Sequence, residues 1–174
     1  MVLVPEIAVS RWFNTSEPLT LSALRGRPVL LHAFPMLCPG CVAHGTPQTQ
    51  RAFELFKKSD LQVIGLHTVF EHQAAMTPVS LEAFIHEYKL TFPIGVDEAS
   101  EDGPIPVTMA RYGMRGTPTS ILIGRHGGVY IMDSASRATW RWARSSRRSS
   151  PQAQGIEREL LRPRLRWIAP VSLI

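Results

Sequence analysis

The feature that most constrains this chain is a pair of cysteines, Cys38 and Cys41, the only two it has. Two cysteines separated by two residues cannot join distant parts of a fold, so a scaffold held together by disulfides is excluded. They follow a nearly unbroken apolar run over residues 29–34, which is typical of a strand buried on both faces. The pair therefore stands where a buried strand passes into a helix, and it is redox-active, metal-binding or accidental.

The rest of the chain alternates between strand and helix patterns. A helix is predicted after the cysteines, with Pro47 expected to kink it, and a second helix is predicted from Thr77, where apolar residues recur with helical spacing. Further elements are predicted as a hairpin at residues 12–27, strands at 61–66, 92–96, 121–123 and 129–132, and a short helix at 106–112. This order predicts an α/β sandwich with helices on both faces of one sheet.

Length and charge narrow the class of protein. With 174 residues, 44% of them hydrophobic, the chain is long enough for one core. Residues 1–136 carry 10 basic and 12 acidic side chains, whereas residues 137–174 carry 9 and 2, so nucleic-acid binding by the main body has no electrostatic support. The longest stretch without a formal charge contains His32 and His44, and no signal peptide is recognisable. We therefore expect no membrane partner and a cytoplasmic location.

A Cys-x-x-Cys pair at the start of a helix has a defined chemistry. Unpaired backbone N–H groups and the positive end of the helix dipole stabilise a thiolate on the first cysteine. The second cysteine lies one turn further along, within reach of a mixed disulfide on the first. Cys38 is therefore predicted to be the nucleophile and Cys41 the resolving thiol. The substrate would be a protein disulfide or a small thiol, with a thiol reductant as partner.

Two motifs resemble the thioredoxin superfamily, more closely its TlpA-like and alkyl hydroperoxide reductase/thiol-specific antioxidant (redoxin) branch. They are Cys-Pro-Gly-Cys at 38–41, after a strand, and Tyr-Gly-Met-Arg-Gly-Thr-Pro-Thr at 112–119, before one. The resemblance covers residues 7–132, with an inserted helix at 77–90. It implies a thioredoxin-like sandwich over residues 1–136, in which helices flank a central mixed sheet.

The same resemblance implies roles for residues around the cysteines. Pro118 would be a cis-proline placed against the Cys-x-x-Cys pair, and Thr117 would offer its backbone to an extended substrate segment. Pro39 and Gly40, between the cysteines, would belong to the same substrate-binding surface. The resemblance implies neither a cofactor nor a metal.

His32 lies six residues before Cys38, where thioredoxins usually hold a buried acid. An imidazole there could accept the proton of the resolving thiol, and the alternative is a core histidine satisfied by a backbone carbonyl. Two residues shortly before Cys38 depart from the family pattern. Leu37 replaces the tryptophan that commonly precedes the first cysteine. Pro35 stands three residues before Cys38, where peroxiredoxins need a threonine or serine to hold the peroxide, and this makes peroxidase activity less favoured. Arg115 could still stabilise a thiolate.

Two alternative functions stay open. One is a peroxiredoxin-like thiol peroxidase acting on a peroxide substrate. The other is a metal-binding or redox-sensing module that combines Cys38 and Cys41 with His32, His44 or His67, because thiolates and imidazoles suit copper or zinc. Copper chaperones with a thioredoxin fold have a longer gap between their cysteines, so thiol–disulfide exchange is the favoured reading.

The end of the chain does not continue the family pattern. Residues 137–174 are strongly basic, and residues 137–150 lack the apolar stripe of a closing helix. Our hypothesis is that a frameshift near Asp133 replaced that helix with a poorly packed tail. The alternative is a genuine basic tail for anionic partners.

Overall fold

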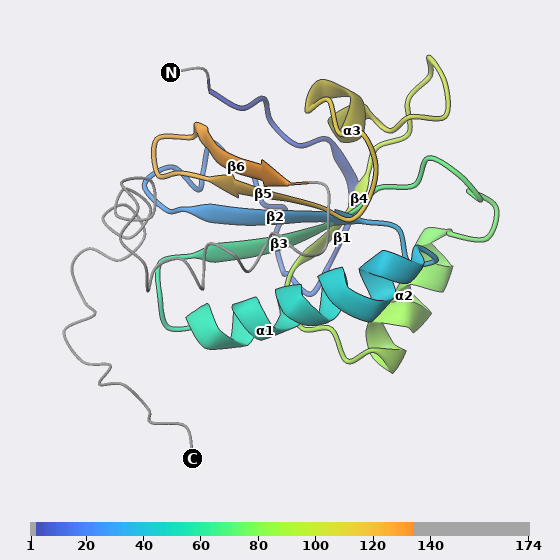
Figure 1. Cartoon of the computed structure of the whole chain (residues 1–174), viewed down its shortest axis with the longest axis horizontal. Coiled ribbons are helices and arrows are strands. Elements are labelled where there is room, and N and C mark those ends of the chain that lie inside the picture. The colour runs from blue at the N-terminus through green and yellow to red at the C-terminus, as the bar shows by residue number, and fades with distance from the viewer. Residues whose placement is uncertain (1–2, 134–174) are drawn as a thin grey trace.

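The computed structural model describes residues 3–133. Its centre is a six-stranded sheet in the order β1-β4-β3-β2-β5-β6 (Figure 1). The strands are β1 (Val9–Phe13), β2 (Val29–Phe34), β3 (Gln62–His67), β4 (Ile94–Asp97), β5 (Thr119–Ile123) and β6 (Val129–Asp133). β2, β3 and β4 run parallel to one another, whereas β1, β5 and β6 are antiparallel to their neighbours. The predicted mixed sheet of a thioredoxin-like fold is confirmed.

β2 lies in the middle of the sheet, between β3 and β5, and all six of its residues are buried. Its parallel register with β3 places Phe34 beside His67, and its antiparallel register with β5 places His32 beside Ser120. Alternate side chains of β2 enter two hydrophobic cores, one on each face of the sheet. The cysteine pair therefore follows a fully buried inner strand of the sheet.

Helices cover both faces of the sheet, as predicted (Figure 1). The chain leaves β2 into a π turn, η1 (Cys41–Gly45), and continues as α1 (Thr46–Phe56); the other helices are α2 (Pro78–Glu87) and α3 (Val107–Arg111). α1 and α2 contribute to one core, and α3 contributes to the other. Within residues 3–133, no helix has the length and apolar character needed to cross a membrane.

The predicted hairpin at residues 12–27 is wrong. β1 instead pairs with β4, and residues 21–26 form turns. The carboxylate of Glu6 stabilises these turns by accepting the N–H groups of Leu21 and Ser22 at 2.7 and 2.6 Å. β4 would otherwise present a free edge with unpaired backbone groups, and β1 satisfies that edge.

The helix that follows the cysteines is irregular just before Pro47, the residue at which a kink was predicted. Pro47 lies in the first turn of α1, but the residues before it are helical too, so its missing N–H leaves a gap in the backbone hydrogen bonds of a continuous helical segment. The irregularity comes earlier, because the N–H of Thr46 donates to the carbonyl of Cys41, five residues back.

The predicted basic tail, residues 137–174, lies outside the described residues, and so does the domain boundary after residue 136. The frameshift hypothesis therefore stays a prediction.

Candidate active site

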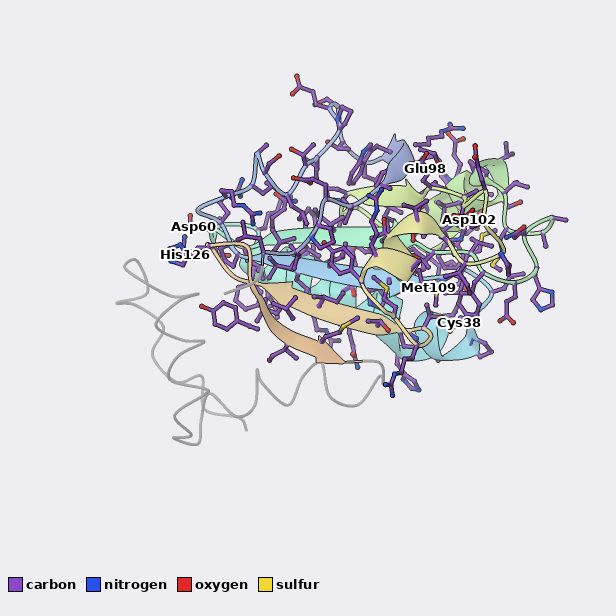
Figure 2. All side chains as sticks on the ribbon, turned by 90° about the horizontal axis from the view of Figure 1, so that it is seen from above. Cys38, Asp60, Glu98, Asp102, Met109 and His126 are labelled. Atoms are coloured by element: carbon purple, nitrogen blue, oxygen red, sulfur yellow. The ribbon has the colours of Figure 1, made fainter. Side chains whose placement is uncertain are left out.

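Cys38 and Cys41 lie where β2 passes into η1, and both are free thiols. Cys38 is partly exposed, whereas Cys41 is fully buried. The backbone N–H of Cys41 points at Cys38 Sγ, 3.2 Å away, so a turn amide stabilises negative charge on the outer sulfur. Figure 2 shows Cys38 at the opposite end of the sheet from Asp60 and His126. The more reachable sulfur is thus the one that the backbone prepares as a nucleophile.

The loop before β5 packs against the cysteine turn. The Thr117–Pro118 peptide bond is cis, and the Cys38 thiol lies 3.8 Å from the Thr117 carbonyl oxygen. A Cβ atom built on Gly40 would lie 3.6 Å from Pro118 Cδ, so the turn between the cysteines lies next to the Pro118 ring. The structure thus brings together segments 77 residues apart in the sequence, measured from Cys41 to Pro118.

The two sulfurs differ in their electrostatic environment. Burial raises the pKa of Cys41 above its usual range, and the hydrogen bond and charge of Cys38 raise it further. Cys41 therefore stays protonated while Cys38 is free. Once Cys38 enters a mixed disulfide it carries no negative charge, and its electrostatic contribution to that raised pKa disappears.

His32 is fully buried in β2, on the face that η1 covers. Its Nδ1 lies 3.2 Å from the Ser120 hydroxyl, so its partner is a side chain and not the backbone carbonyl of the alternative prediction. Nε2 has no hydrogen-bond partner within the described residues. Burial lowers the pKa of His32 to about 4, so the ring is neutral at pH 7.

Gly45 is a site residue that sequence reasoning missed. A Cβ atom here would lie 2.6 Å from Cε1 and 3.0 Å from Nε2 of His32, and 3.1 Å from Cβ of Pro118. Only a residue without a side chain allows η1 to approach both rings this closely. The sequence signal was a glycine four residues after Cys41, in a segment otherwise predicted to be helical.

A cleft of about 390 Å³ opens beside Cys38. One wall comes from the predicted site, namely Pro35, Leu37, Pro39, Gly116 and Thr117, and the other from the loop after β3, namely Phe70, Glu71, His72 and Met76. Sequence reasoning missed this second wall, because no local pattern tells which face a loop will meet. Arg115, predicted to contact the thiolate, is exposed and is not among the residues that line the cleft.

The three histidines invoked for a metal site do not form a ligand cluster with the cysteines in the described part of the chain. His44 is exposed, and His67 is fully buried against Phe34, with ring centroids 5.7 Å apart. Among residues 3–133 no three histidine, cysteine or carboxylate side chains lie close enough to hold a metal ion. The geometry gives the metal-binding alternative no support.

Comparison with known proteins places this chain in a family. The family model for AhpC/TSA matches residues 4–132. The chain belongs to the AhpC/TSA family. The resemblance predicted from the two motifs is confirmed over almost the same residues.

The relatives of this AhpC/TSA chain agree on its fold. A crystal structure of a thioredoxin-like superfamily protein is 43% identical, with a TM-score of 0.76, and the match covers 90% of this chain and 94% of that one. A thiol-disulfide isomerase from Corynebacterium glutamicum is 37% identical, with a TM-score of 0.75 and coverage of 92% and 97%. The thiol-disulfide oxidoreductase ResA of Halalkalibacterium halodurans is 26% identical over 113 residues, 65% of this chain. That match spans only 57% of the ResA sequence.

Proposed function

We propose that this protein is a thiol–disulfide oxidoreductase that works through Cys38 and Cys41. The observation that carries the proposal is the asymmetry of the pair. Cys38 lines an open cleft and receives a backbone N–H, while Cys41 is buried directly behind it. The names of the Corynebacterium glutamicum isomerase and of ResA describe the same chemistry in those relatives.

The exchange takes place in two steps. The Cys38 thiolate attacks one sulfur of a substrate disulfide, a Cys38–substrate disulfide forms, and the other substrate sulfur leaves as a thiolate that takes up a proton. Cys41 then loses its proton and attacks Cys38 Sγ, so the Cys38–Cys41 disulfide forms and the second substrate thiol is released. The substrate gains two electrons and two protons, and a thiol reductant returns the enzyme to its dithiol form.

His32 is the proposed proton acceptor for Cys41. It lies on the buried side of η1, and its lowered pKa keeps a nitrogen lone pair available at neutral pH. An imidazolium next to the new thiolate would form a buried ion pair, which stabilises both charges at the moment they appear.

The substrate site would be formed by the cleft around Cys38. The Thr117 carbonyl, next to the cis bond, faces the Cys38 sulfur and is placed to meet an extended segment of a disulfide-bearing protein. Pro39 also lines the cleft, and Gly40 would belong to the same surface. Peroxide reduction has weaker support, because Pro35 offers no hydroxyl to hold a peroxide and Arg115 does not line the cleft.

The test compares two reactions of the full chain. Dithiothreitol-dependent reduction of insulin should proceed and should be lost in Cys38→Ser, while hydrogen peroxide consumption should stay near background. Rapid peroxide consumption without insulin reduction would replace the proposal with the peroxidase alternative. Equal insulin reduction by the wild type and Cys38→Ser would refute a role for this cysteine pair.

A further inference from the structure

The hydrogen bond between His32 and Ser120 has no part in the proposal above. The two residues are register partners on neighbouring antiparallel strands, and their side chains lie on the same face of the sheet. Ser120 is 7% exposed, and its hydroxyl lies 3.2 Å from His32 Nδ1. This is the one hydrogen-bond contact of the imidazole within residues 3–133.

The other nitrogen of the ring faces η1. A Cβ atom on Gly45 would lie 3.0 Å from His32 Nε2, so the ring edge bearing Nε2 lies directly beneath the π turn that begins at Cys41. Cys41 and Gly45 are both buried and stand one π turn apart, on the inner face of η1. His32 thus has one nitrogen fixed by β5 and the other directed at the segment that carries the resolving thiol.

Which nitrogen carries the proton decides whether His32 can act. A neutral imidazole has one N–H and one lone pair. When Nδ1–H donates to the serine oxygen, the lone pair is on Nε2 and faces η1. In the opposite tautomer an N–H group would be buried against Gly45 without an acceptor, which costs about 1–3 kcal/mol.

We propose that Ser120 is a positioning residue that accepts the Nδ1–H of His32 and thereby holds Nε2 as a proton acceptor towards Cys41, with Gly45 leaving room for this arrangement. The inference rests on the proposed function and deepens it, since it concerns the resolving step alone. In that step the Cys41 proton moves to Nε2, directly or through one water. The Cys41 sulfur bonds to Cys38 Sγ, the bond from Cys38 to the substrate sulfur breaks, and the departing substrate thiolate takes up a proton.

The rates of the two steps can be separated with a chromogenic aromatic disulfide. Capture by Cys38 releases one coloured thiolate, and resolution by Cys41 releases the second. We expect Ser120→Ala to slow the second release roughly tenfold at pH 7, by analogy with the hydrogen-bond partners that orient metal-binding histidines, and to change the first less than about twofold. Ser120→Thr keeps the hydroxyl and should restore the second release.

A matched control removes a buried hydroxyl elsewhere. Thr68 is fully buried and donates to Asp97 at 3.0 Å, so Thr68→Val loses a comparable hydrogen bond without touching His32. It should lower stability and leave both releases unchanged. If Thr68→Val slows the release of the second thiolate as much as Ser120→Ala does, the effect of Ser120 is one of stability alone, and the inference is overturned.

A direct measurement detects the tautomer of His32. Nitrogen-15 NMR of the wild-type histidine side chains should show His32 protonated at Nδ1 and unprotonated at Nε2. In Ser120→Ala the preference for this tautomer should be lost. A wild-type ring protonated at Nε2 would overturn the inference.

Failure of this inference is distinguishable from failure of the proposed function. If His32→Ala slows the second release and Ser120→Ala does not, Ser120 has no positioning role although His32 remains the base. If Cys38→Ser still releases the coloured thiolate, the thiol–disulfide mechanism itself is wrong, and the inference falls with it.

Discussion

Acid should destabilise this fold through two histidines that are buried without charge partners. Burial lowers the pKa of both His32 and His67 to about 4, from 6.5. An unfolded chain therefore binds more protons than the folded one wherever the pH lies between these values. The free energy of unfolding should be highest above pH 6.5 and should fall as the pH drops towards 4.

The size of the effect follows from the two pKa values. A tenfold change in proton affinity is worth about 1.4 kcal/mol, so each histidine should lower the free energy of unfolding by roughly 2 kcal/mol between pH 7 and pH 5. Both together remove roughly 4 kcal/mol from a total that is about 5–15 kcal/mol for most domains. Burial raises the pKa of Asp97, and this carboxyl acts in the opposite sense because its folded form takes up a proton more readily.

Urea unfolding at pH 7 and pH 5 measures this loss. In His67→Leu the difference between the two pH values should shrink by about half, and the pH 7 stability should not fall, because neither ring nitrogen of His67 has a partner within the described residues. His86→Gln is the control, since the His86 side chain is 86% exposed. A wild-type difference below about 1 kcal/mol, or an unchanged difference in His67→Leu, would refute the reasoning.

Three further outcomes are expected. Cys41→Ser should accumulate a mixed disulfide with its substrate on Cys38, visible by mass spectrometry, because the resolving attack is lost; free Cys38 after incubation would contradict this. Gly45→Ala should lower the free energy of unfolding by about 1–3 kcal/mol in urea titration, since its methyl group would overlap the His32 ring, and an unchanged midpoint would show that the ring moves aside freely. Glu6→Gln should cost about 1 kcal/mol through the weakened turn at residues 21–26, and thermal unfolding at constant pH measures it.

Elements with strong local patterns were predictable. The apolar run of β2 could only be a buried strand, and the cysteines after it had to lie at the end of that strand. The cis-proline loop could be located because the family motif carries it. These features depend on residues close together in the sequence or on a motif whose context is known.

Contacts between distant segments were not predictable in the same way. The pairing of β1 with β4 depends on which edge of the sheet lacks a partner, and that edge is known only once the order of the strands is fixed. The cleft wall at residues 70–76 has the same origin. The contact between Gly45 and His32 depends on the π turn, and the only sign of it in the sequence of η1 is a glycine in a segment predicted to be helical.

Replacing the usual buried acid by His32 changes which protonation state the fold provides. Burial favours the neutral form of either group, but a neutral carboxylic acid already holds the proton it could accept, whereas a neutral imidazole has a nitrogen lone pair that can accept one. With a pKa of about 4, His32 is ready at pH 7 to accept the Cys41 proton, and only about one ring in a thousand is charged. Formation of the Cys38–Cys41 disulfide thus starts from the neutral imidazole, which is the populated form of His32. Reduction of this disulfide by an external thiol needs the rare imidazolium, because Cys41 must be protonated. The rate of reduction, corrected for ionisation of the attacking thiol, should therefore rise as the pH falls from 8 to 5, and the rate of disulfide formation should stay level. Equal pH profiles in the two directions would show that His32 takes no part in moving the proton.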